Sequence, residues 1–597
     1  SSAALELLKW VGSQQRSMVV VCPNEAQAAE FHDQLRFFQR VSPVNTSILF
    51  YPARETDFMP SQYQSEDIVD QRLSVLYVCT QNQPSLIITS LKALAQKTIP
   101  TKIFKENINA IMLHDELNRD EMIQKFIQAG YERENTCRSI GSFSVRGDIL
   151  DFYSPNHLNP IRIEFFGNQV ERIVYFDADS QSSKTSETLE YVEWIPAHEI
   201  LLAVVDKKNV LRNIKNLADD LNLPPESRSH IEESVREHIL LPSMDHFFPL
   251  FYDSQESLIH HLPKDFQWVL NDPLSLKTEI QNIEFEFQKN PQETKKLQSN
   301  PQDFLIDLES LEKKISEKTE LYLSEVDFHF TFENQLVAFD GISLHQELQS
   351  ELIRNKKSQR PYAPLADKIK QWADQGLRLH IVASEKSFER VQKLLQPYLP
   401  SHTFSHSIEL GKSDDPLRIS LISGDLHHGF SSKPQEMVIL TESEIFGEQK
   451  FKQARVVTQE NLLESFNELE IGEPIVHIDH GIGLYQGLKK MTIAGIDHDF
   501  LVIQYQDQDK LFLPVYRLNR IHKYISADGK KAKVDKLGGQ NWEAAKKKAQ
   551  KAIEKMAQEL IELYARRKIA KGYSYSKPDE TYTEFEVEFP FEETRDQ

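Results

Sequence analysis

The sequence predicts a multi-domain α/β protein, and three observations support that fold class. The chain has 597 residues, which corresponds to about four domains at roughly 150 residues each. Hydrophobic residues make up 40% and charged residues 27%, the composition of globular domains that bury cores. Short apolar runs alternate with amphipathic helical stretches, as in parallel sheets whose strands are connected by helices.

The cysteine content predicts a protein without a metal or disulfide scaffold. The three cysteines, Cys22, Cys79 and Cys137, lie too far apart in sequence for a zinc ribbon or a paired redox site. No run approaches the roughly 18 apolar residues of a membrane span, and the first ten residues lack the layout of a signal peptide. We therefore expect a soluble, cytoplasmic protein with no membrane contact.

The net charge limits how the chain can meet nucleic acid. The formal charge is −21, so a polyphosphate would be repelled by the chain as a whole. Residues 530–571 are the exception, with thirteen Lys or Arg against five Asp or Glu. This basic segment is compatible with a solvated helix face, a phosphate contact or an acidic partner.

The first half of the chain reads as one α/β domain that carries an insert. Apolar runs at 17–22 and 86–88 predict buried parallel strands within residues 1–112. The same pattern of apolar runs and helical stretches resumes over 195–320. Between them, residues 113–194 change to a helix followed by alternating strands, with turn chemistry at 167–168. We expect a small α+β insert there.

The second half predicts smaller modules in series. Strand and helix patterns indicate a second α/β domain, and dense short strands with turn residues indicate a small antiparallel barrel. Apolar residues then recur at three- and four-residue steps, which predicts a helix of about 45 Å. The expected order is an α/β domain at 325–447, a linker at 448–470, the barrel at 471–535, the helix at 540–570 and a final segment at 571–597.

Two motifs invite catalytic or metal interpretations that the pattern does not support. Residues Gly411, Lys412 and Ser413 resemble the end of a phosphate loop, but His406 stands where that loop needs its first glycine. His477 and His480 follow a strand and lack a third nearby ligand. No serine-hydrolase or zinc-protease motif occurs. The sequence therefore predicts neither a catalytic residue nor a metal site.

The strand at 161–166 is the most informative candidate for binding. Period-two alternation places its residues on two faces: Ile161, Ile163 and Phe165 on one, Arg162, Glu164 and Phe166 on the other. With the aliphatic face buried, Arg162 and Phe166 would stand together outside, the composition of a binding hot spot. Arg146 would join them from a neighbouring strand. Coverage of Phe166 by another element is an equally open reading.

Longer segments of the chain resemble known repair proteins. The stretches YPARETDFMPSQYQSEDIVDQRLSVL at 51–76 and SVRGDILDFYSPNHLNPIRIEFFGNQVERIVYFDADSQ at 144–181 resemble the region shared by the excision-repair helicase UvrB and the bacterial transcription-repair coupling factors. GEPIVHIDHGIGLYQGL at 472–488 and KLGGQNWEAAKKKAQKAIEKMAQELIELYARR farther on resemble the polymerase-interacting domain and relay helix of the coupling factors alone. The resemblance covers essentially the whole chain.

This resemblance implies participation in transcription-coupled nucleotide excision repair. The family comprises ATP-dependent DNA translocases that recognise stalled RNA polymerase and recruit UvrA. The chain departs from the family because it stops at EFPFEETRDQ, which resembles the segment just before the motor, and because its first domain lacks a phosphate loop. We therefore expect a monomeric, non-enzymatic amino-terminal part with no cofactor. ATP, magnesium and most double-stranded DNA contact would belong to the motor.

The resemblance also assigns roles to domains and residues. It makes 1–112 with 195–320 a degenerate UvrB-like domain, 113–194 the UvrA-binding insert and 471–535 an SH3-like barrel shared with the regulator CarD. The implied UvrA-binding residues are Arg146, Arg162 and Phe166. The implied contacts with the RNA polymerase β subunit are Leu488, Lys489, Lys490, Met491, Thr492 and Ile493, which would form a strand edge with Ile493 as apolar anchor.

Two other function classes remain open from the sequence. A general transcription regulator of the CarD type would share the barrel but would leave residues 1–320 without a role. A nucleotide-dependent enzyme would need an atypical site at 411–413. The role of 325–447 and the placement of the 540–570 helix have no sequence signal.

Overall fold

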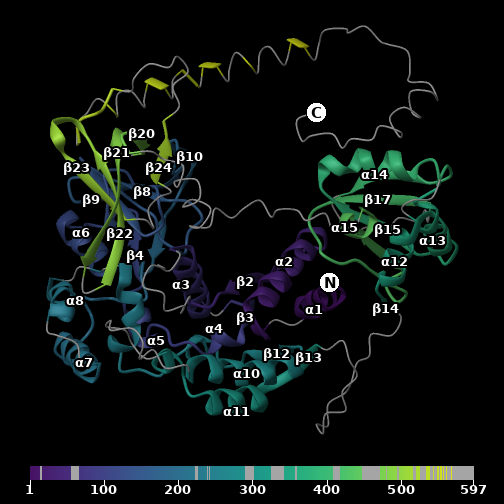
Figure 1. The fold of residues 1–597 in the computed structure, drawn as a ribbon, viewed down its shortest axis with the longest axis horizontal. Coiled ribbons are helices and arrows are strands. Elements are labelled where there is room, and N and C mark those ends of the chain that lie inside the picture. The colour runs from purple at the N-terminus through teal and green to yellow at the C-terminus, as the bar shows by residue number, and fades with distance from the viewer. Residues whose placement is uncertain are drawn as a thin grey trace. The chain divides into compact units, whose positions relative to one another are not determined.

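A computed structural model gives the fold of the chain (Figure 1). It describes residues 1–13, 16–54, 66–81, 83–221, 226–237, 240, 242–288, 301–323, 342–355, 360–407, 410, 417–446, 471–478, 480–493, 496–514, 520–524, 533–537 and scattered residues from 542 to 567. The chain divides into two units, Ser1–Val456 with Met491–His498 and Val457–Lys490 with Asp499–Gln597.

The first sheet of the larger unit is five-stranded and parallel. Its order is β13-β12-β1-β3-β2, and each neighbouring pair runs parallel. The strands expected around 17–22 and 86–88 are confirmed as β1 and β3, and every residue of both is buried, as in a sheet covered on both faces. The strands are β1 (Met18–Cys22), β2 (Ser47–Tyr51), β3 (Ser85–Ser90), β12 (Gln267–Asn271) and β13 (Thr319–Leu323).

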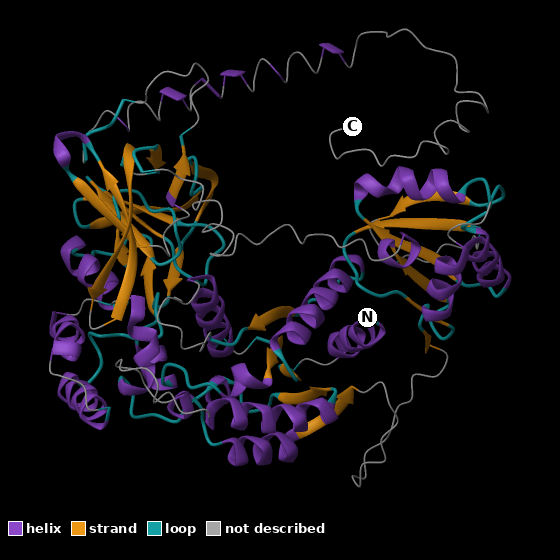
Figure 2. Ribbon diagram, viewed as in Figure 1, coloured by secondary structure: helices purple, strands orange, loops and turns teal. Residues whose placement is uncertain are grey.

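Helices connect these strands (Figure 2). Helix α2 follows β1 directly, and the side chain of Asn24 caps it by accepting a hydrogen bond of 2.9 Å from the backbone N–H of Gln27. The helices of this domain are α1 (Ser2–Ser13), α2 (Glu25–Val41), α3 (Glu66–Thr80), α4 (Leu91–Ala95), α5 (Thr101–Glu106), α7 (Lys207–Asp220), α8 (Glu226–Glu237), α9 (Leu258–His261), α10 (Pro273–Gln288) and α11 (Leu308–Lys318), with 3₁₀ helices η1 (Pro242–Leu250) and η2 (Pro301–Phe304).

The insert is built on a six-stranded sheet of order β10-β9-β8-β7-β6-β5. Its pairs are antiparallel apart from β5 with β6, and a separate pair joins β4 to β11. The elements are β4 (Asn109–Met112), α6 (Arg119–Gln128), β5 (Glu132–Arg133), β6 (Ser142–Arg146), β7 (Ile149–Phe152), β8 (Ile161–Phe166), β9 (Gln169–Phe176), β10 (Ser183–Thr188) and β11 (Tyr191–Trp194).

Aromatic packing fills the inner face of the insert. The ring of Phe126 on α6 stacks on Trp194 at 4.4 Å between centroids and on Phe143 at 5.5 Å. Ile161, Ile163 and Phe165 belong to the same buried cluster, which confirms the aliphatic face expected for this strand. Because that face is closed by the core, a partner cannot reach the sheet from this side.

The third sheet lies within the range expected for the second α/β domain, 325–447. Its order is β14-β18-β19-β15-β17-β16, and β15, β16, β17 and β19 run parallel. The elements are β14 (Ile342–Ser343), α12 (Gln346–Asn355), α13 (Ala363–Asp374), β15 (Arg378–Ala383), η3 (Glu385–Ser387), α14 (Phe388–Leu395), β16 (Thr403–Ser407), β17 (Arg418–Ser423), β18 (Phe430–Ser432), β19 (Met437–Thr441) and α15 (Glu442–Phe446).

A further five-stranded sheet, most of whose residues belong to the smaller unit, has the order β23-β22-β21-β20-β24. The described pairings are antiparallel and enclose a small core around Ile475, Leu501 and Ile503. Most of the expected helix at 540–570 lies outside the described residues. The elements are β20 (Pro474–His477), β21 (Gly481–Ile493), β22 (Ile496–Gln504), η4 (Gln506–Gln508), β23 (Lys510–Pro514) and β24 (Ile521–Lys523).

Two further findings concern the whole set of described residues. No helix among them is long and apolar enough to cross a membrane. The thiols of Cys22, Cys79 and Cys137 are free and buried, and burial raises the pKa of each to about 12.

Candidate protein interfaces

The outer face of the insert sheet carries a buried carboxylate between two arginines. Asp151 on β7 lies directly opposite Arg162 on β8, and its side chain is fully buried. Nη2 of Arg146, at the end of β6, donates to Oδ2 of Asp151 at 2.6 Å. Nε and Nη2 of Arg162 donate to Oδ1 and Oδ2 of the same carboxylate at 2.8 and 3.0 Å. The two predicted arginines are therefore joined through a residue that the sequence analysis did not single out.

The expectation that Arg162 stands exposed beside Phe166 was wrong. The side chain of Arg162 is only 11% exposed, and its guanidinium lies over the ring of Phe176 at 4.6 Å. Its hydrogen bonds to Asp151 raise the pKa of the guanidinium, although burial opposes this. Alternation assigned the correct face, but the carboxylate of Asp151 on the next strand draws the arginine inward.

Phe166 is exposed, as expected for a contact residue. The residue is 78% exposed and ends β8 next to a turn in which Gly167 has a φ of 63°, a conformation that favours glycine. A register shift between Glu164 and Phe165 marks a local irregularity in this strand. The alternative reading, in which another element covers Phe166, is excluded.

One cross-strand rung lies between the arginines and Phe166. Glu164 pairs with Ile149 on one side and with Arg172 on the other. Nη1 of Arg172 lies 3.5 Å from Oε1 of Glu164, and both side chains are about one third exposed. The exposed groups of the outer face are therefore Arg146, the partly exposed pair of Glu164 and Arg172, and Phe166.

The second predicted surface lies on β21, whose residues up to Lys490 belong to the smaller unit. β21 is not an edge strand of its sheet, because β20 and β22 flank it. The pairing with β20 covers only Gly481 to Leu484, and Tyr485 still bonds to the backbone of Glu473. The strand edge beyond Tyr485 has no β20 partner among the described pairings.

The side chains of this later half are partly described. Leu488 is 54% exposed, Lys489 and Lys490 are also exposed, and Nζ of Lys489 lies 5.7 Å from the ring centroid of Phe512. Met491 is half-buried. The side chains of Thr492 and Ile493 lie outside the described residues, so the anchor role of Ile493 stays a prediction.

A short segment clasps the start of β21. The backbone N–H of Asp535 donates to the carbonyl of Ile482 at 2.8 Å, and Oδ2 of Asp535 accepts from the N–H of Ile482 at 2.8 Å. The indole of Trp542 donates to the carbonyl of Ile478 at 2.9 Å. Sequence reasoning missed this clasp, because 533–537 carries no strand pattern.

The two histidines at the base of this sheet stack on each other. The ring centroids of His477 and His480 are 4.7 Å apart. Among the described residues, no group of three or more His, Cys, Asp or Glu side chains is placed to hold a metal ion. Residues 411–416, with the phosphate-loop-like motif, lie outside the described residues.

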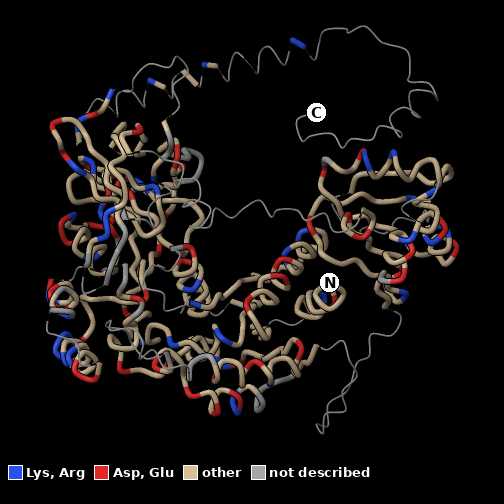
Figure 3. The backbone as a smooth tube through the Cα atoms, viewed as in Figure 1, with Lys and Arg blue, Asp and Glu red and all other residues tan. Residues whose placement is uncertain are grey.

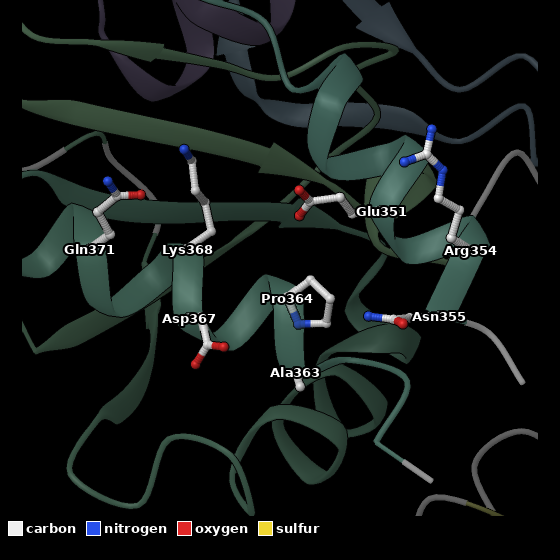
Figure 4. A pocket seen from close by; sticks show the side chains of 8 residues that line it. All are labelled: Glu351, Arg354, Asn355, Ala363, Pro364, Asp367, Lys368 and Gln371. Carbon is white, nitrogen blue, oxygen red and sulfur yellow. The ribbon is translucent and has the colours of Figure 1, made fainter. Parts of the chain in front are cut away.

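A shallow groove between α12 and α13 contains none of the predicted site residues (Figure 4). Its charged groups are of both signs, as are those of every described module in Figure 3. The groove therefore favours no particular ligand. It is lined by Glu351, Arg354, Asn355, Ala363, Pro364, Asp367, Lys368 and Gln371.

Comparison with known proteins matches both surfaces to described domains. Residues 110–199 match the family described as the UvrB interaction domain, and residues 469–525 match the CarD-like/TRCF RID domain. The first match includes Arg146, Asp151, Arg162 and Phe166, and the second includes 488–493.

Full-length comparison finds relatives with one shared name. The chain is 28% identical to the transcription-repair-coupling factor of Myxococcus xanthus over 98% of its length and 50% of that relative. It is 28% identical to that of Bacillus subtilis over 92% of its length and 47% of the relative, and 26% identical to that of a Staphylococcus aureus strain over 99% and 50%. The chain thus spans about half the length of the curated relatives it matches, and over almost its whole length it is similar to proteins named transcription-repair-coupling factor.

Proposed function

We propose that this chain couples transcription to nucleotide excision repair by binding RNA polymerase and UvrA. One observation carries the proposal: a UvrB interaction domain at 110–199 and a CarD-like/TRCF RID domain at 469–525 occur in the same chain. A protein with one surface for each partner can bring both to the same place and raise the effective concentration of one near the other.

The outer face of the insert is the proposed UvrA surface. Phe166 supplies an exposed aromatic group at the end of a rigid strand, and Arg146 supplies a half-exposed guanidinium. Aromatic residues and arginine are enriched at protein-binding hot spots. Because the aromatic core of the insert holds the sheet from behind, the binding groups lose little conformational freedom when a partner docks.

The later half of β21 is the proposed surface for the polymerase β subunit. An unpaired strand edge offers backbone donors and acceptors to an incoming strand, and its alternate side chains select the partner. Leu488 is exposed and Lys489 and Lys490 lie beside it. We propose that 488–493 pair with a β-subunit strand and that Ile493 provides apolar contact.

The domain roles are part of the same proposal. Residues 1–112 with 195–320 form a UvrB-like domain without a nucleotide site, and 471–535 form an SH3-like barrel followed by a relay helix at 540–570. We further propose that the chain is monomeric, that it hydrolyses no nucleotide and that a motor in the complete protein supplies most DNA contact. The asparagine cap at the start of α2, in place of a phosphate loop, supports the second point.

Pull-down with two purified partners tests the proposal. The chain should retain both UvrA and RNA polymerase. Phe166→Ala should lower only UvrA retention, and Leu488→Arg should lower only polymerase retention. Retention of polymerase without UvrA would favour a CarD-type regulator, and DNA-stimulated ATP hydrolysis would favour a nucleotide-dependent enzyme.

A further inference from the structure

We infer that Arg162 and Asp151 are positioning residues that hold Arg146 in place for the partner, and that Arg146 is the arginine that touches it. This inference rests on the proposed UvrA surface and assigns different roles to its residues. Asp151 and Arg162 position Arg146, whereas Phe166 contacts the partner directly.

The guanidinium of Arg162 is already hydrogen-bonded to other groups of the insert. Nε and Nη2 donate to Asp151, and Nη1 donates to the carbonyl of Gln181 and the hydroxyl of Ser183, each at 3.1 Å. All three guanidinium nitrogens therefore have partners inside the insert. A protein partner would have to displace these bonds before Arg162 could serve it, and breaking a buried charged hydrogen bond is costly.

Arg146 is in the opposite situation. Its side chain is 44% exposed. Its contacts within the described part of the chain are made through Nη2, to Asp151 at 2.6 Å and to Gln181 at 3.5 Å. One edge of the guanidinium is thus held while the rest faces outward, the arrangement of a preorganised contact group.

Asp151 connects the two arginines, so the position of Arg146 depends on Arg162. Its carboxylate is fully buried and is shared by both guanidinium groups through Oδ2. If Arg162 is removed, the carboxylate loses its bidentate partner, and Arg146 is left as the only cation on it. Arg146 would then be drawn inward or lose its fixed orientation, since a buried carboxylate requires compensation. Either result weakens partner binding without any direct contact by Arg162.

A double-mutant cycle on the whole chain tests this inference by UvrA affinity. We expect Arg146→Ala and Arg162→Ala each to weaken binding by about 10- to 100-fold. The double variant should be no weaker than Arg146→Ala alone, because Arg162 acts through Arg146. The cycle of Arg162→Ala with Phe166→Ala serves as the matched control and should be additive, since Phe166 stands exposed apart from the carboxylate.

Two further variants keep the test valid if Arg162→Ala does not fold. Asp151→Asn keeps the shape of a residue that no partner can touch, yet it should weaken UvrA binding as Arg162→Ala does. Arg162→Lys keeps the charge but loses the bidentate fork, so its affinity should lie between those of wild type and Arg162→Ala. Unchanged affinity in Asp151→Asn would overturn the inference.

The outcomes separate this inference from the proposed function. If the wild-type chain fails to bind UvrA, or if Phe166→Ala and Arg146→Ala both bind normally, the proposed surface is wrong and the inference falls with it. If those variants weaken binding but Arg146→Ala and Arg162→Ala are additive, the surface is correct and Arg162 contacts UvrA directly.

Discussion

Arg72 and Glu199 are buried partners that join the α/β domain to the end of its insert. Nε of Arg72, on α3, donates to Oε1 of Glu199 at 2.6 Å, and both side chains are almost fully buried. Arg54 binds the other oxygen of the carboxylate, and the hydroxyl of Thr98 donates to that oxygen at 2.8 Å. Glu199 follows the last strand of the insert, so this cluster fixes the place where the chain returns to the parallel sheet.

This cluster predicts that stability falls in acid. Burial alone would raise the pKa of the Glu199 carboxyl, but Arg54 and Arg72 outweigh it and lower the pKa to about 2 from its ordinary value of 4.5. The folded form therefore binds a proton on Glu199 more weakly than the unfolded form does. The resulting stabilisation, on the order of 3 kcal/mol, is fully present above pH 4.5 and is lost as pH falls toward 2. Denaturant unfolding across this range measures it.

Glu199→Gln provides the control for this pH dependence. The variant should be less stable than wild type at pH 7 by about 3 to 5 kcal/mol, because it leaves two buried guanidinium groups without their carboxylate. The difference between the two proteins should shrink as the pH approaches 2. A constant difference across the range would show that Glu199 is not the titrating group.

Phe166→Ala should separate binding from stability. Phe166 is 78% exposed, so its removal should change the unfolding free energy by less than about 0.5 kcal/mol. It should weaken UvrA binding by about 1 to 4 kcal/mol if it is a hot spot. Calorimetric titration and thermal unfolding give the two numbers.

Leu158→Ala is the matched control for Phe166→Ala. Leu158 is 94% exposed in the loop before β8, whereas Phe166 ends that strand. Normal UvrA affinity in this variant would assign the loss to the Phe166 end of the sheet. Equal loss in both variants would mean that the contact surface extends along the whole strand.

The fold could be predicted from the sequence where periodicity dominates. Fully buried runs such as Met18–Cys22 and alternating runs such as Ile161–Phe166 have patterns set by the sheets that contain them. The outward placement of Arg162 failed because alternation specifies a face and not the depth of a side chain. Burial of Arg162 depends on Asp151 and Phe176 on neighbouring strands, and such cross-strand partners follow from register, which local sequence does not state.

The same limit applies to β21. Its strand character was expected, but a local pattern cannot show which part of a strand keeps a neighbour. β20 ends at His477, and this short length leaves the later half of β21 without β20 pairing. The clasp of Asp535 on Ile482 was also not predictable, since it depends on one backbone and one side-chain hydrogen bond between residues 53 positions apart.

The three cysteine thiols should react only slowly with disulfide reagents in the folded chain. Burial raises the pKa of the Cys22, Cys79 and Cys137 thiols to about 12, so the reactive thiolate is scarce at pH 8. A disulfide reagent such as dithionitrobenzoate should titrate less than one thiol within minutes under native conditions and all three in denaturant. Rapid native reaction of one thiol would place that cysteine in a locally open region.

Leu488→Arg should abolish most polymerase binding while the chain stays folded. Leu488 is 54% exposed on the later half of β21, so the free chain loses little core, but a bound strand would have to desolvate the guanidinium. The expected cost is on the order of 2 to 4 kcal/mol, a loss of about 30- to 1000-fold in affinity, and Ile493→Arg should act similarly. Leu560→Arg, at a residue of similar exposure outside the sheet, serves as the control. Biolayer interferometry measures the affinity, and circular dichroism confirms that the variant is folded. A folded Leu488→Arg chain that binds polymerase as tightly as wild type would show that this edge is not the docking site.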